Sequence, residues 1–175
     1  NVKIFKRELR SFDSIEGKRA YCANVRAPSI CKLLSNLQQP LLYLDVDSII
    51  RKDLSDLFSQ IEAHDITIHF RPDAPQHMRV ATGVIGFGNS CTALKISENW
   101  ANLIQVEDRI FNWFSDQLYL NEVITQIANV RASHLEKTFI DWDFSDSSAI
   151  WVGKGPRKFS VAYRDAERLA SRSSR

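Results

Sequence analysis

The chain has 175 residues, of which 44% are hydrophobic and 25% charged, and its formal net charge at pH 7 is +2. This length supports one domain with a substantial core, and the composition excludes a disordered or fibrous chain. No apolar stretch has membrane-spanning length, no secretory leader is visible, and the net charge gives no reason to expect a nucleic-acid partner.

The first half of the chain alternates between strand and helix patterns. The chain starts at Asn1 with no initiator methionine, and residues 2–9 already have a strand-like pattern, so we expect an N-terminal part to be missing. Ser29 is the expected cap of a helix, because apolar residues recur at helical spacing after it. The predicted elements are a strand over 2–9, a loop over 11–17, a helix over 28–37, a strand over 41–44, a short helix over 53–58 and a strand over 65–70.

The second half continues the alternation. We therefore expect an α/β fold with a mixed, mostly parallel sheet flanked by helices, in a single domain over 1–160. Residues 161–175 form a basic tail, either a frayed helix or disordered. The predicted elements are a loop over 71–77, a strand over 80–87, helices over 90–106 and 111–127, strands over 129–135 and 148–152, and a turn over 153–156.

The cysteines and the basic end bear on compartment and partners. Cys22, Cys31 and Cys91 show no Cys-x-x-Cys or zinc-type spacing, so we expect reduced thiols and a cytoplasmic protein. A locally cationic end suits phosphates or peripheral contact with an anionic membrane. Its basic residues are Lys154, Arg157, Lys158, Arg164, Arg168, Arg172 and Arg175.

The strongest functional signal is at residues 41–47, where an apolar run of strand length ends in two carboxylates. Alternate residues of a strand share a face, so we expect Asp45 and Asp47 to point to the same side. Like charges at the end of a buried strand require a positive partner, and a hard divalent cation takes oxygen ligands. The pair therefore predicts a metal site beyond the carboxyl end of a strand.

Two classes of enzyme place paired acids after such a strand. Haloacid-dehalogenase-type phosphatases use the first Asp as nucleophile and the second as general acid, with magnesium bound nearby. Sugar-nucleotide transferases use the pair to hold a metal on the diphosphate. A phosphatase would also need a later acidic pair, and the candidate, Asp141 with Asp143, follows no clean apolar run.

Residues 43–54, with the sequence YLDVDSIIRKDL, resemble the Asp-x-Asp segment of GT-A glycosyltransferases, particularly glycosyltransferase family 8. Further segments resemble parts of that family in the same chain order, from about residue 21 to residue 158. They are the segment before Pro28 that carries Arg26, the glycine-bearing strand with Gly83, the pair Asp116-Gln117, and the closing Gly-x-x-Lys segment Gly155 to Lys158 with Lys154.

The resemblance implies a GT-A-like, Rossmann-like fold that moves a hexose from a nucleoside diphosphate sugar to an unknown carbohydrate, lipid or protein acceptor. Mn²⁺ or Mg²⁺ on Asp45 and Asp47 would act as a Lewis acid on the leaving diphosphate. Lys158, with Lys154 or Arg157, would add fixed positive charge there, and backbone amides around Gly153 and Gly155 would form a small anion cradle.

The donor contacts are also implied by the resemblance. Arg26 and Gly83 would lie against the nucleotide sugar. Asp116 and Gln117 would lie against its sugar, with one of them stabilising the anomeric centre or binding hydroxyls. Trp142 is the candidate for stacking on an acceptor sugar, although aromatic side chains at such spacing are more often part of a core.

The sequence departs from the family pattern at two positions. Val152 stands where the family usually supplies a histidine as third metal ligand, and Ala81 stands where it has an asparagine. Val152 and the short N-terminal part leave a third hypothesis open, a non-catalytic relic that binds a sugar or a nucleotide.

Overall fold

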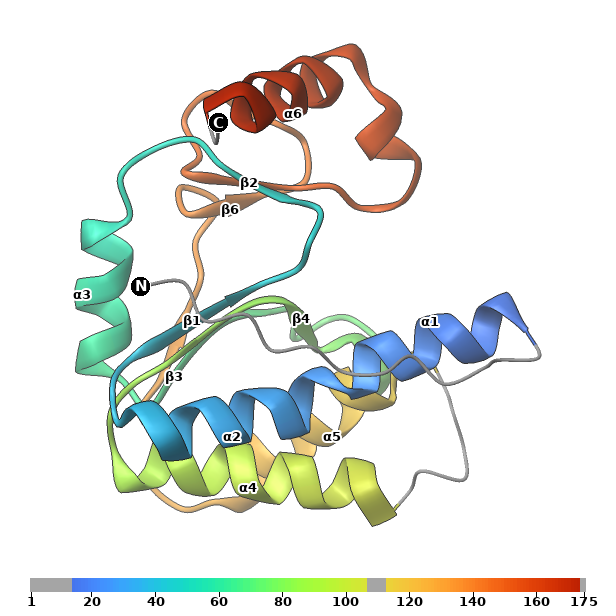
Figure 1. The fold of residues 1–175 in the computed structure, drawn as a ribbon. Helices are drawn as coiled ribbons and strands as arrows, with labels where there is room; N and C mark the ends of the chain where they lie inside the picture. Colours follow the sequence, from blue (N-terminus) through green and yellow to red (C-terminus); the bar gives the residue numbers. More distant parts are fainter. Residues whose placement is uncertain (1–13, 107–112, 174–175) are drawn as a thin grey trace.

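The chain is described here by a computed structural model that covers residues 14–106 and 113–173 (Figure 1). The predicted strand over 2–9 lies outside these residues. Within them, no helix is both long enough and apolar enough to cross a membrane. The helices are α1 (Ile15–Asn24), α2 (Arg26–Leu37), α3 (Ser55–Ala63), α4 (Cys91–Val106), α5 (Ser115–Gln126) and α6 (Val161–Ser173), with 3-10 turns η1 (Gln76–Met78) and η2 (Gly155–Phe159).

The described strands form a larger sheet in the order β1-β4-β3-β5 and a smaller sheet in the order β2-β7-β6. β4 runs antiparallel to β1 and β3, and β2 antiparallel to β7, whereas β3–β5 and β6–β7 are parallel. The expected mixed α/β fold is confirmed, but parallel pairing does not predominate among these strands. Their bounds are β1 (Leu41–Leu44), β2 (Ser48–Ile50), β3 (Ile66–Phe70), β4 (Val80–Phe87), β5 (Ala132–His134), β6 (Ile140–Asp141) and β7 (Ile150–Val152).

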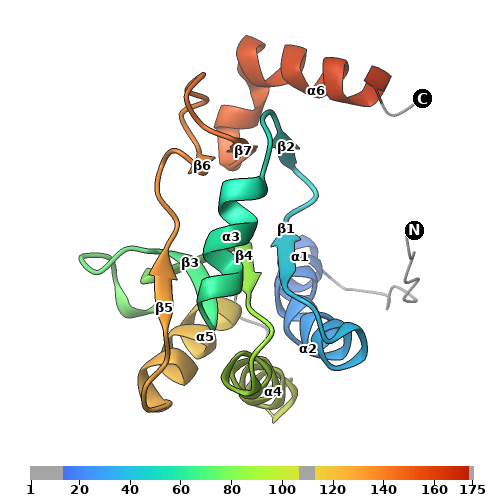
Figure 2. The same ribbon diagram turned by 90° about the vertical axis from the view of Figure 1, so that its left-hand side faces the viewer.

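The larger sheet is the middle layer of the molecule. Helices α2, α4 and α5 cover one face, and α3 lies against the other (Figures 1 and 2). The core under the three helices is centred on Trp100 and Phe87, which are fully buried. The second core joins Leu57 and Ile61 of α3 to Val84 and to β7. The smaller sheet therefore packs beside the end of the larger one, with α6 across it (Figure 1).

Strands β1 and β4 have the bounds that the sequence predicts, because both are mostly apolar runs, β1 between Pro40 and Asp45 and β4 between Arg79 and Gly88. Gly86 of β4 is required by packing, since a Cβ there would collide with the side chain of Ile61. This close approach seats α3 on the sheet and fixes the position of β4.

Two local predictions are wrong, and one strand was missed. Residues 11–17 are not wholly a loop, because Ser14 accepts a hydrogen bond from Gly17 N at 3.0 Å and starts α1. Helix α2 begins at Arg26, so Ser29 is not its cap and instead donates to Val25 O at 2.8 Å. Strand β2 was not predicted at all, since its short segment gains its pairing only from β7.

The C-terminal segment forms helix α6, which is one of the two predicted alternatives. Tyr163 anchors it, with 2% of the residue exposed. Its hydroxyl donates to Asp47 O at 2.7 Å, and its ring packs on Phe144. The helix is therefore tied to the same turn that carries the paired acids.

Candidate functional site

Asp45 and Asp47 lie in the turn between β1 and β2, where Asp45 directly follows β1 and Asp47 directly precedes β2. Ser48 N donates to Asp45 O at 3.0 Å, Asp45 N donates to Gly83 O at 2.8 Å, and Gly153 N donates to Asp47 O at 2.8 Å. The expectation that strand alternation aligns the two acids is therefore wrong. The two acids still interact electrostatically. Burial raises the pKa of Asp47, and the negative charge of Asp45 raises it further.

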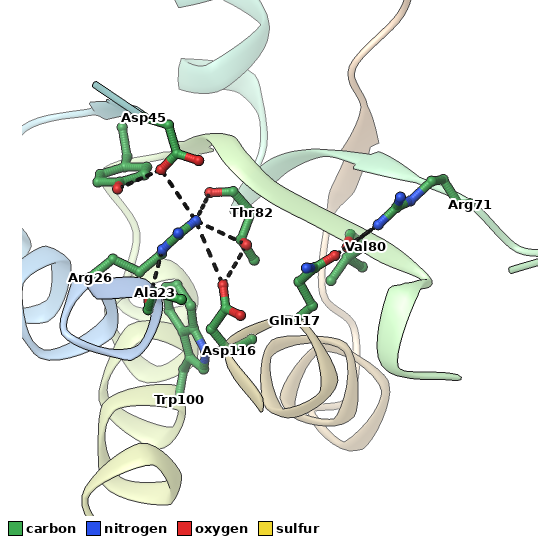
Figure 3. Close-up of polar contacts among 10 residues, drawn as sticks. Ala23, Arg26, Asp45, Arg71, Val80, Thr82, Trp100, Asp116 and Gln117 are labelled. Atoms are coloured by element: carbon green, nitrogen blue, oxygen red, sulfur yellow. Dashed lines mark hydrogen bonds and ion pairs between the residues drawn. The ribbon is translucent and has the colours of Figure 1, made fainter. Parts of the chain in front are cut away.

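Arg26 is the centre of a polar network between Asp45 and Asp116 (Figure 3). Its Nη1 lies 3.4 Å from Asp45 Oδ1 and 3.6 Å from Asp116 Oδ2. It also donates to Thr82 O at 2.7 Å, while Nε donates to Ala23 O at 2.8 Å. The side chain is only 11% exposed. The Arg26 guanidinium is thus a positive partner of Asp45 and Asp116, and protein contacts hold both its Nε and its Nη1.

Asp116 lies in the first turn of helix α5 and is 1% exposed. Thr82 Oγ1 donates to its Oδ2, whereas Oδ1 is buried and has no hydrogen-bond partner in the described part of the chain. Burial raises the pKa of Asp116, although Arg26 and Thr82 favour its charged form. Trp100 Nε1 donates to Asp116 O at 2.9 Å and fixes the start of the helix. One acceptor of the site is thus left unsatisfied.

Gln117 is held by Arg71, a residue to which the sequence analysis gave no role. Arg71 Nη2 donates to Gln117 Oε1 at 2.8 Å and to Val80 O at 3.0 Å (Figure 3). Because the amide oxygen is occupied, the amide nitrogen is the group that Gln117 has left to offer a ligand. The signal that points to Arg71 is its position directly after β3, where ligand-binding residues gather.

Beside Gly83, Asp45 comes close to Val152, the position at which the resemblance expects the third metal ligand. A Cβ on Gly83 would lie 3.0 Å from Asp45 Oδ2 and 3.8 Å from Val152 Cγ1. The pairing of β2 with β7 also places Ser48 opposite Val152. The position at which the family resemblance expects a histidine is therefore beside the acids, and the residue there is a buried valine.

The closing segment contributes its cations to the same place. The charge of Lys158 lowers the pKa of Asp47, although burial raises it overall. Burial lowers the pKa of Lys154, and Asp45 opposes that shift. Gly155 has φ +59° and no atom within 4 Å of its would-be Cβ, so its part is to turn the backbone.

The described residues offer a divalent metal two carboxylates. They contain no group of three or more His, Cys, Asp or Glu side chains placed to hold an ion. Asp45 Oδ1 already accepts from Tyr43 OH at 2.8 Å, while Oδ2 faces Gly83. Burial and the charge of Asp45 raise the pKa of Asp47, so a bound cation would favour its charged form. Mg²⁺ is commonly held by one or two carboxylates together with substrate phosphates and water. The donor set therefore fits a metal that arrives with a diphosphate.

Two other predicted residues have mainly structural contacts. Asp141 is 3% exposed and accepts from Asp143 N at 2.9 Å and Ser145 N at 2.7 Å, so it caps a loop. This engagement weakens the phosphatase alternative, which needed Asp141 as a free acid. The Trp142 ring lies 4.8 Å from the His69 ring in an edge contact and remains partly exposed.

The comparisons agree with the geometry at the level of fold. No family model matches the chain, and no curated protein matches it at a significant level. Among solved structures, it is similar to a glycosyltransferase involved in the glycosylation of the major capsid of PBCV-1, with a TM-score of 0.57 and 14% identity. The match covers 93% of this chain and 81% of that one. The chain therefore has a glycosyltransferase-like fold.

Proposed function

We propose that this protein transfers a sugar from a nucleoside diphosphate sugar, in the manner of GT-A enzymes that resemble glycosyltransferase family 8. The observation that carries the proposal is the meeting of five separate segments at one end of the larger sheet. They contribute Arg26, Asp45 with Asp47, Gly83, Asp116 with Gln117, and Lys154 with Lys158.

The acidic turn and the closing segment would bind the diphosphate. Asp45 and Asp47 would hold Mn²⁺ or Mg²⁺ together with phosphate oxygens, and the ion would stabilise charge on the leaving group. Lys158 would add a fixed positive charge beside Asp47. Because no third protein ligand is present among the described residues, we expect metal and nucleotide to bind together.

The network around Arg26 would form the floor of the sugar site. Arg26 holds Asp45 and Asp116 in place, so neither acid needs to move when a ligand binds. The unsatisfied Oδ1 of Asp116 is buried, so it would reach a hydroxyl only if the groups that cover it moved aside, and Gln117 offers its amide nitrogen. These groups are suited to hydroxyls of the donor sugar, with Gly83 leaving room beside Asp45.

The test is binding and turnover with a panel of nucleoside diphosphates and their hexose conjugates, with Mn²⁺ and with EDTA. We expect one nucleotide to bind with Mn²⁺ and its sugar conjugate to be hydrolysed slowly. Asp47→Ala should weaken the metal-dependent binding at least tenfold. Asp56→Ala is the matched control, because Asp56 is exposed on α3 and loses the same charge.

Other outcomes would identify the alternatives. A phosphorylated Asp45 after incubation with a phosphate monoester would indicate a phosphatase. Nucleotide-sugar binding that needs no metal and leads to no turnover would indicate a non-catalytic binding protein. Absence of binding by any member of the panel would contradict the proposal.

A further inference from the structure

The main-chain carbonyl of Asp47 accepts hydrogen bonds from two separate points of the C-terminal part of the chain. Gly153 N donates to it at 2.8 Å, and the Tyr163 hydroxyl donates to it at 2.7 Å. These donors are the two ends of residues 153–163, which follow β7 and run through η2 into α6 (Figure 1). The segment is therefore closed into a loop on the turn that carries the paired acids, and we call it the clamped loop.

The other contacts of the clamped loop with the described part of the chain are weak ones. Residues 154–157 are exposed. The ion pair between Arg157 and Asp143, at 3.8 Å, joins two side chains that are both more than half exposed. The Lys154 amine lies 5.9 Å from the centre of the Trp142 ring. Exposed ion pairs and exposed cation–π contacts contribute little, so the shared carbonyl is the main polar anchor of the loop.

Tyr163 reaches this carbonyl because its ring is buried and residue 153 has no side chain. The Tyr163 ring lies 5.1 Å from the Phe144 ring, and the residue is 2% exposed. A Cβ on Gly153 would lie 2.6 Å from the Tyr163 hydroxyl oxygen, so only glycine fits there. The ring contacts do not depend on the hydroxyl. Tyr163→Phe should consequently keep α6 in place while it releases one end of the clamped loop.

We propose that Tyr163 is a positioning residue for the diphosphate, because its hydroxyl ties the clamped loop to Asp47 and so holds Lys158 beside the acidic turn. This inference rests on the proposed function, in which Lys158 contacts the leaving phosphates. Lys158 lies midway between the two donors, and it is less exposed than either neighbour in the chain. Its charge lowers the pKa of Asp47, which agrees with a position near the same turn.

The physical reason is conformational entropy. A lysine on a free loop loses conformational freedom when it meets a phosphate, and this loss weakens binding. A loop that is closed at both ends has lost part of that freedom before the ligand arrives. The Tyr163 hydroxyl thus raises the affinity for a diphosphate without touching it.

A purely structural role for the Tyr163 hydroxyl makes a different prediction. If the hydroxyl only stabilises the fold, its removal will lower the resistance to urea and leave nucleotide affinity unchanged. If it positions Lys158, its removal will weaken diphosphate binding, and replacing Lys158 as well will then cost little more. The coupling between the two residues is therefore the decisive quantity.

The experiment measures dissociation constants for UDP, GDP, ADP and CDP by calorimetry in the presence of Mn²⁺. The proteins are the wild type, Tyr163→Phe, Lys158→Gln and the double variant. We expect each single substitution to weaken binding of the preferred nucleotide about tenfold. The double variant should also be weakened about tenfold, whereas two independent effects would multiply to about a hundredfold.

Ser148→Ala is the matched control. Ser148 is fully buried before the start of β7, at the end of that strand away from Gly153, and its hydroxyl donates to Ser145 O at 2.8 Å. That carbonyl keeps a second donor, Trp151 Nε1, just as Asp47 O keeps Gly153 N. Both variants therefore lose one buried hydroxyl-to-carbonyl bond. We expect a similar loss of resistance to urea in both, and unchanged nucleotide affinity in Ser148→Ala.

Three results would overturn the inference while nucleotide binding by the wild type upholds the proposed function. They are unchanged affinity in Tyr163→Phe, a double variant weakened about a hundredfold, and Ser148→Ala weakened as much as Tyr163→Phe. Failure of every nucleotide to bind the wild type would overturn both.

Discussion

Replacement of Arg26 by methionine tests the network on which the site is built. The substitution keeps the aliphatic stem but leaves Asp116, which is 1% exposed, without its opposite charge. Removing one partner of a buried ion pair costs about 3–5 kcal/mol. Because Asp116 also keeps one oxygen unsatisfied, we expect a loss of about 4 kcal/mol in unfolding free energy at pH 7.

The pH dependence follows from the same contacts. Burial raises the pKa of Asp116, and loss of Arg26 will raise it more. The folded state then binds the proton more tightly than the unfolded chain, so this contribution to stability is largest at low pH and declines as pH rises through the raised pKa. The deficit of Arg26→Met relative to the wild type should therefore shrink as the pH falls from neutral through the raised pKa of Asp116 in the variant.

Urea denaturation at several pH values measures this effect, and a double-mutant cycle isolates it. Arg26→Met combined with Asp116→Asn removes both charges, so it should recover at least about 2 kcal/mol of the loss. A deficit that is constant with pH, or a double variant no more stable than Arg26→Met, would refute the argument that Asp116 is held ionised by Arg26.

Two further predictions follow from other parts of the structure. Val152→His should lower the Mn²⁺ dissociation constant about tenfold, because Val152 Cγ1 and Asp45 Oδ2 both lie within 4 Å of the position that a Cβ on Gly83 would take. Electron paramagnetic resonance of free Mn²⁺ measures this affinity, with Val152→Ala as the control. Unchanged affinity in a folded variant would contradict the prediction. Asp65→Asn should cost about 1–3 kcal/mol at pH 7, since Asp65 accepts hydrogen bonds from Arg131 and Ser90. Burial opposes ionisation of Asp65, but these bonds lower its pKa overall, so the stabilisation exists above its ordinary pKa and is lost as pH falls through the lowered one. Equal stability of Asp65→Asn and the wild type in urea at pH 7 would disprove that contribution.

The sequence by itself predicted the strands that frame the site and the place of the paired acids. An apolar run of four residues before Asp45, and the glycine-bearing run of β4, are local patterns, and a local pattern suffices to specify a buried strand. The order of motifs also pointed to a glycosyltransferase-like fold, which the similarity to a solved structure supports.

Tertiary structure alone decided how the charges of the site are compensated. Arg26 and Thr82 are 56 residues apart, and Arg71 and Gln117 are 46 apart, so no spacing along the chain indicates that they bond. The pairing of β2 with β7, which brings Val152 beside the acids, also depends on contacts distant in sequence. Local pattern determines which segments become strands and helices, whereas ion pairing and unpaired charge depend on which segments meet in space.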